Sequence, residues 1–167
     1  MTEAAPYYDV VVLPALLRHA RYTYGIAMRD ALAEGGFDDV PKNGLYVLGG
    51  LALGAGGVPL GQLIKELRIS KQAAGQLVDA LVLRGYLARL PDADDRRKLT
   101  VTLTERGRAA AAIQMAAREK IDTELIARVG EEDVRRTRRV LAALIDIGHE
   151  AGLPARETDA SSAEETS

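Results

Sequence analysis

The charged segment PDADDRRK, from Pro91 to Lys98, contains the residue types that point most directly to chemistry. It holds three aspartates, two arginines and a lysine between two short runs, YLARL and LTVTLT, whose alternation predicts a β-hairpin. Arginines at the tip of such a hairpin can enter a DNA minor groove or contact phosphates, while neighbouring carboxylates hold them in position. A charged, solvated turn is the alternative interpretation, so the flanking sequence has to decide between them.

The preceding residues, 60–85, predict a helix, a short turn and a second helix. Pro59 can open the first helix, Ser70 can cap the second, and Gly85 can end it. The second helix has an apolar stripe formed by Ala74, Leu77, Val78, Leu81 and Val82. Its opposite face carries Lys71, Gln72, Gly75, Gln76 and Asp79.

This polar face suits a DNA major groove. Glutamine can pair with an adenine edge, lysine can reach a guanine or a phosphate, and a glycine allows close approach of the helix. An ordinary solvated face would carry similar residues, but a helix–turn–helix followed directly by a charged hairpin favours DNA. The predicted DNA-binding residues are Arg68, Ser70, Lys71, Gln72, Gly75, Gln76, Asp92, Asp95, Arg96 and Arg97.

The rest of the chain is predicted to be helical. One helix is expected from Pro14 to the Gly35-Gly36 pair, one after Pro41, one from Glu105 to Gly130, and one from Glu131 onward. The predicted fold class is therefore mainly α with a small β-hairpin wing, a winged helix–turn–helix domain with further helices on either side. Residues 153–167 are small, polar and acidic, and we expect them to be disordered.

Composition limits the function classes. The 167 residues contain no cysteine, which excludes disulfides, thiolate metal sites and cysteine nucleophiles. The net charge is −2, yet residues 60–108 carry ten basic and six acidic side chains, so the predicted DNA-binding region is locally basic. No apolar run reaches the ~18 residues that span a bilayer, and the first residues are a poor match to a signal peptide; we expect a cytoplasmic protein.

The segment GYLARLPDADDRRKLTVTLTERG resembles the wing of the MarR-type transcriptional regulators, a pattern written D-x-R-D-x-R followed by strand residues and L-T-x-x-G. Asp92, Asp95 and Arg97 fall on this pattern, as do Leu103, Thr104 and Gly107. Asp94 departs from it, because many members have the groove-inserting arginine at that position. Arg96 or Arg97 is then expected to enter the minor groove.

The resemblance implies a homodimer whose N-terminal helix and last two helices interlock. It implies dimerisation regions at residues 1–36 and 105–152 on either side of a DNA-binding domain at residues 37–104. It also implies a small, often aromatic or phenolic effector bound between the dimer helices and the winged helix. The candidate effector-binding residues are His19, Tyr22, Tyr24, Met28 and Tyr46; for each, packing in the core or at the dimer contact is the competing interpretation.

We therefore expect a homodimeric, ligand-responsive repressor that binds double-stranded DNA at a pseudo-palindromic operator. No cofactor and no metal site is expected, since His19 and His149 have no spacing that demands a metal. The sequence contains no phosphate loop, nucleophile elbow or zinc-helix motif, so an enzyme is not expected. Two alternatives stay open: a winged helix that binds protein, and a constitutive DNA binder without a ligand.

Overall fold

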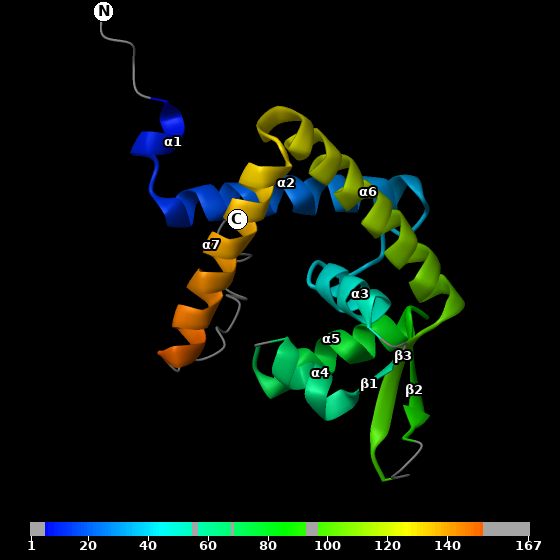
Figure 1. The fold of residues 1–167 in the computed structure, drawn as a ribbon. Helices are drawn as coiled ribbons and strands as arrows, with labels where there is room; N and C mark the ends of the chain where they lie inside the picture. The colour runs from blue at the N-terminus through cyan, green and yellow to red at the C-terminus, as the bar shows by residue number, and fades with distance from the viewer. Residues whose placement is uncertain (1–5, 55–56, 68, 93–96, 152–167) are drawn as a thin grey trace, which may run out of the picture.

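The computed structural model describes residues 6–54, 57–67, 69–92 and 97–151. Seven helices and three strands follow one another in this part of the chain (Figure 1). Their bounds are α1 Tyr7–Val10, α2 Leu13–Glu34, α3 Gly44–Leu53, β1 Gly57–Pro59, α4 Leu60–Glu66, α5 Lys71–Leu83, β2 Leu87–Pro91, β3 Leu99–Leu103, α6 Glu105–Val129 and α7 Glu131–Glu150. The predicted fold class, mainly α with a small wing, is confirmed.

The central lobe consists of α3, α4, α5 and the three strands, below α2 and α6 in Figure 1. Its core is aliphatic, as expected from a chain with only seven aromatic residues. The largest side chains with almost no exposure are Tyr86, Leu48, Leu81, Leu87, Val47, Val78 and Val101. They come from α3, α5, the sheet and, for Tyr86, the connection between α5 and β2, so these elements share one core.

Helix α5 begins and ends where the sequence predicts. The Ser70 hydroxyl accepts a hydrogen bond from the Ala73 amide at 3.2 Å. At the other end Gly85 has a φ of +75°, and the Tyr86 amide donates to the Leu81 carbonyl at 2.9 Å. This is a Schellman motif, which only a residue that tolerates the left-handed region forms without strain.

The sheet has one more strand than the hairpin that the sequence predicts. Strands β2 and β3 pair antiparallel, with Leu87 opposite Leu103 and Pro91 opposite Leu99. The short strand β1 pairs with the other edge of β3, giving the order β1-β3-β2. Its three residues, Gly-Val-Pro, carry no strand pattern, and Pro59 fits because β1 is an edge strand. The one-turn helix α1 was also not predicted.

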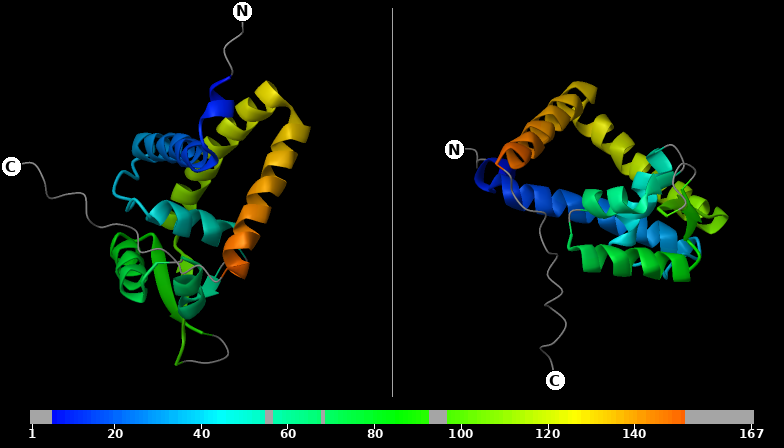
Figure 2. Two further views of the ribbon diagram at one scale, coloured as in Figure 1. Left: turned by 90° about the vertical axis from the view of Figure 1, so that its left-hand side faces the viewer. Right: turned by 90° about the horizontal axis from the view of Figure 1, so that it is seen from below.

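The remaining helices form an arm above the lobe. Helix α2 packs along α6, and α6 also contacts α3, so the arm and the lobe are one packed unit. Helix α7 leaves α6 at Gly130, which has a φ of +81°, and the two helices diverge from this corner in both views of Figure 2. Among the described elements, α6 is the only one with which α7 makes more than marginal contact.

The arm meets the lobe at a tight joint between Tyr86 and the start of α6. The Thr104 hydroxyl accepts from the Gly107 amide at 3.0 Å and donates to the Gly85 carbonyl at 2.5 Å. A Cβ on Gly107 would lie 2.1 Å from the Tyr86 carbonyl oxygen. Thr104 and Gly107, two positions of the predicted motif, thus have a structural role: they fix the start of α6 against the lobe.

We predict that Gly107→Ala destabilises the protein by about 3 kcal/mol, because the added methyl meets a backbone atom that cannot rotate away. Chemical denaturation measures this change in the free energy of unfolding. Gly75→Ala is the matched control, because a Cβ at this position would have no neighbouring atom within 4 Å. It should stabilise the protein by about 0.5–1 kcal/mol through helix propensity. Equal stability of the two variants would contradict the proposed joint.

Candidate nucleic-acid interface and adjoining cavity

The polar face of α5 is open to solvent as predicted. Lys71, Gln72 and Gln76 are exposed, whereas Ala74, Leu77, Val78 and Leu81 of the predicted apolar stripe are buried. Gly75 lies between Lys71 and Gln76 with open space above it. The face therefore combines donors, acceptors and one position without a side chain, which matches the requirements for reading base edges at short range.

An ion pair links this face to the wing. The Arg89 guanidinium on β2 contacts the Asp79 carboxylate on α5, with the two side chains 30% and 64% exposed. Asp79 would otherwise present an uncompensated negative charge beside Gln76. The helical pattern predicted Asp79 on this face but not its partner, since nothing in the spacing of a helix residue and a strand residue reveals the pair.

In the described part of the wing, two hydrogen bonds of Asp92 connect the end of β2 to the start of β3. The Asp92 carboxylate accepts a hydrogen bond from the Thr100 hydroxyl at 2.9 Å, and the Asp92 amide donates to the Lys98 carbonyl at 3.0 Å. These bonds join the two strands where the charged loop begins. Arg97 is exposed just beyond them. The other predicted residues of this surface, Arg68, Asp95 and Arg96, and also Asp94, lie outside the described residues.

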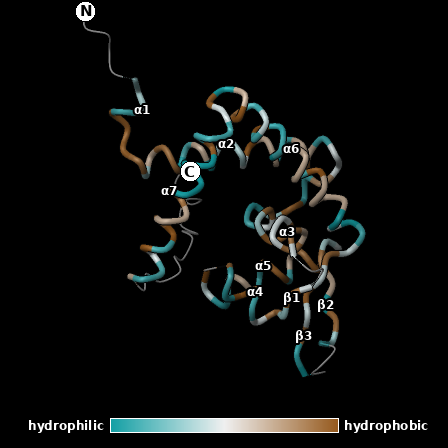
Figure 3. Tube along the Cα trace, viewed as in Figure 1, coloured by the Kyte–Doolittle hydropathy of each residue, from teal (hydrophilic) through white to brown (hydrophobic). Residues whose placement is uncertain are grey.

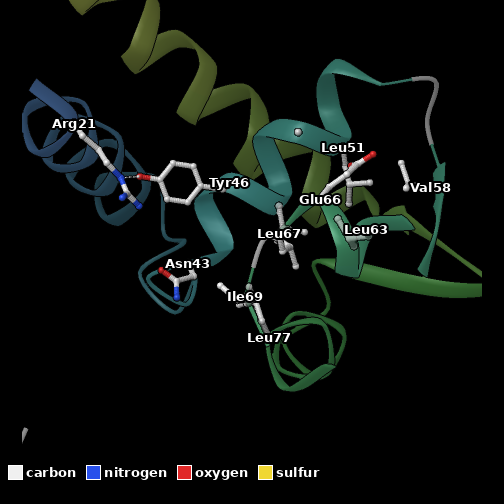
Figure 4. Close-up of a pocket in the computed structure, with 12 residues that line it drawn as sticks. Arg21, Asn43, Tyr46, Leu51, Val58, Leu63, Glu66, Leu67, Ile69 and Leu77 are labelled. Carbon is white, nitrogen blue, oxygen red and sulfur yellow. Dashed lines mark hydrogen bonds between the residues drawn. The ribbon is translucent and has the colours of Figure 1, made fainter. Parts of the chain in front are cut away.

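A cavity of about 450 Å³ lies between α3, α4 and α5 (Figure 4). Its wall is largely apolar and includes Leu51, Val58, Leu63, Leu67 and Leu77. At one end Arg21 reaches from α2 and donates to the Tyr46 hydroxyl at 2.7 Å. Its guanidinium carbon lies 4.9 Å from the centre of the Tyr46 ring.

A second, wider groove of about 650 Å³ lies along α2 and the start of α3, and it shares Arg21, Asn43 and Tyr46 with the cavity. Three of the five candidate effector residues, His19, Tyr22 and Tyr46, border this groove. Met28 and Tyr24 do not line it. Met28 is buried in the core, and Tyr24 faces α6.

Tyr24 makes a specific bond across the arm. Its hydroxyl donates to the Asp122 carboxylate on α6 at 2.5 Å. Burial raises the pKa of Tyr24 to about 12, and the hydrogen bond to Asp122 adds to this effect. This phenol therefore holds α2 against α6, a role that its position in the sequence did not reveal.

Comparisons with known proteins agree with this geometry. Residues 39–98 match the model of the MarR family. The fold is similar to Streptococcus pneumoniae FabT in complex with DNA, at a TM-score of 0.71 and 18% identity over 87% of this chain and 99% of that one. The family match rests on the central winged-helix lobe. The matched segment contains α3 to β2 and the charged residues that follow β2 in the sequence.

Two further solved structures have a similar fold. Staphylococcus aureus MepR in its DNA-binding conformation has a TM-score of 0.68 and 18% identity, over 81% of this chain and 98% of that one. A mutant MarR from E. coli with operator DNA has a TM-score of 0.64 and 20% identity, over 84% and 99%. A search of curated proteins finds no match.

Two other kinds of feature are absent from the described residues. These residues contain no group of three or more histidine, aspartate or glutamate side chains arranged to hold a metal ion. Within the same ranges, every helix is too short or too polar to cross a bilayer.

The raised pKa of Tyr24 predicts a pH dependence of stability. Between pH 10 and about 12 the unfolded chain loses this proton while the folded protein keeps it, so the contribution of Tyr24 is present below pH 10 and falls as the pH rises. Comparing denaturation of the native protein with Tyr24→Phe isolates this group from other alkaline effects. The native protein should lose stability more steeply across this window; parallel curves would contradict the assignment.

Proposed function

We propose that this protein is a homodimeric transcriptional regulator of the MarR family that binds a pseudo-palindromic operator, represses transcription and is released by a small effector. The observation that carries the proposal is the exposed Lys71, Gln72 and Gln76 face of α5, held beside a wing in a lobe that matches the family model. FabT and MarR, two proteins of similar fold, have been solved with DNA. A dimer bound across an operator would exclude other proteins from it, which is why we propose repression.

The proposed contacts divide by groove. Lys71, Gln72 and Gln76 approach the major groove, Gly75 permits close approach, and Ser70 and Arg68 contact phosphates near the helix start. Arg96 or Arg97 contacts the minor groove or its phosphates, and Asp92 and Asp95 hold these arginines in position. The DNA-binding domain is residues 37–104.

The proposed dimer uses residues 1–36 and 105–152. Helix α7 has no buried residue in the single chain, and Val140, Leu144, Ile145 and Ile147 are 42–60% exposed. Hydrophobic positions also recur from α1 into the start of α2 (Figure 3). An apolar stripe of this kind on a long helix that stands apart from its own lobe is expected to pack against a second subunit.

The proposed effector is a small aromatic or phenolic molecule. The apolar cavity is large enough for one, and Tyr46 lies at its junction with the groove that His19 and Tyr22 border. Tyr24 and Met28 would act indirectly, because they pack between α2 and α6 or in the core. Since Arg21 of α2 and Leu77 of α5 both line the cavity, a bound molecule would change the position of α5 relative to α2.

We propose no catalytic activity and no cofactor, and we expect the protein in the cytoplasm with its DNA target. A protein partner for the winged helix is the competing function. Salt separates the two, because binding that neutralises phosphates weakens steeply as salt is added.

We predict that Arg97→Ala weakens binding to duplexes selected by the protein from a random library by about 1 kcal/mol or more, while lowering the salt slope by about one phosphate contact. Gln76→Ala should instead relax sequence preference at one position of each half-site, by about 1–3 kcal/mol. Fluorescence anisotropy at two or more salt concentrations measures both.

The matched control is Arg128→Ala, which removes a 71% exposed arginine on α6 far along the chain from the lobe. It should bind DNA as the native protein does. Failure to enrich any sequence from the library, with salt-insensitive binding, would contradict operator recognition.

We also predict that Val140→Glu combined with Leu144→Glu converts the dimer into a monomer of 17.9 kDa, because both side chains lie on one face of α7. Light scattering after gel filtration measures the mass. Leu83→Glu is the control, since Leu83 is 86% exposed on α5 and lies outside the proposed interface. A native protein that is already monomeric would refute the proposed dimer.

A further inference from the structure

The groove along α2 is strongly cationic. Of the described residues that line it, Arg18, Arg21, Arg29 and Lys42 are cationic, whereas no aspartate or glutamate lines it. In a chain whose net charge is −2, this local excess is pronounced. A groove walled by charges of one sign attracts a ligand of the opposite sign.

These cations have no carboxylate partners in the described structure. Arg18, Arg29 and Lys42 make no ion pair there, in contrast to Arg89, Arg106, Arg128, Arg135 and Arg136, which are all paired. Arg21 bonds the neutral Tyr46 hydroxyl, which leaves its charge uncompensated. The mutual repulsion of four such groups is relieved if an anionic segment enters the groove.

The chain itself supplies such a segment. Residues 152–167 contain four acidic residues, Glu157, Asp159, Glu164 and Glu165, and one arginine, for a net charge of −3. They follow Ala151, directly after α7. Sixteen residues can span up to ~50 Å, while a compact chain of this length has a radius of gyration of ~15 Å, so length does not prevent contact.

We propose that this C-terminal segment docks into the cationic groove. Charge complementarity favours the groove over the α5 face, where Asp79 contributes a carboxylate and Arg89 is already paired. The docked segment would lie next to the Arg21–Tyr46 contact, at the junction with the apolar cavity (Figure 4). It would then compete with any other anion for this groove. The inference goes beyond the proposed function and does not depend on DNA binding.

Because the chain has no cysteine, Ser161→Cys creates a single attachment point for a nitroxide spin label on the full-length protein. The measurement is the loss of backbone amide NMR signals near the label, compared with the same sample after reduction of the nitroxide. We expect losses at Arg18, Tyr22 and Gly25 and at Lys42 to Tyr46. Raising the salt to 1 M, where the Debye length is ~3 Å, should restore these signals.

Two labelled variants test the charge requirement. Arg18→Gln combined with Arg29→Gln should restore the groove signals at low salt, whereas the control Arg128→Gln combined with Arg135→Gln should not. Losses confined to α5, losses spread evenly over the surface, or no losses would each overturn the proposal. So would groove losses that survive both 1 M salt and the groove variant. Circular dichroism verifies that all variants stay folded.

Discussion

The structure depends on one close approach, between the Tyr86 carbonyl oxygen and the first turn of α6 at Gly107. Helix α6 is the long element that joins the lobe to the arm, and its direction is set within these few residues. The Thr104 side chain caps the helix and at the same time bonds the Gly85 carbonyl. A larger residue than glycine would push α6 away from β2, and with it α2 and α7. The relation of the proposed DNA-binding face to the proposed dimer contacts is therefore determined here.

Two helix ends support this joint from the other side. Gly36 ends α2 as Gly85 ends α5, each with a positive φ, and each is followed by an aromatic residue. The rings of Phe37 and Tyr86 thereby lie 6.3 Å apart, and the Arg106 guanidinium lies over both. Arg106 also binds Asp39, and the Tyr86 hydroxyl together with Arg106 lowers the pKa of that carboxyl. The helix ends at Gly36 and Gly85 thus bring side chains from three separate segments of the chain into one cluster.

The sequence predicted those features that local rules determine. The cap at Ser70, the helix ends at Gly85 and Gly130, and the apolar stripe of α5 each depend on neighbours within one or two turns, so the helices could be assigned. Strand β1 could not, because Gly57–Pro59 becomes a strand only through pairing with β3. For the same reason the Asp79–Arg89 pair, the Thr100 bond to Asp92 and the Tyr24 bond to Asp122 were missed. Each joins residues whose proximity exists only in the folded chain.

Tyr24 and Tyr46 show why residue type alone does not identify a binding site. Both are tyrosines on helices, and both were candidates for an effector site. Tyr24 uses its hydroxyl to join α2 to α6, whereas the Tyr46 ring is 46% exposed and its hydroxyl accepts from Arg21 at the edge of a cavity. A ligand that displaced Arg21 from Tyr46 would exchange one hydrogen bond for another, but one that displaced Asp122 would separate two packed helices. The Tyr24 contact therefore costs more to open, because it joins two packed helices, than the Tyr46 contact at the edge of the cavity.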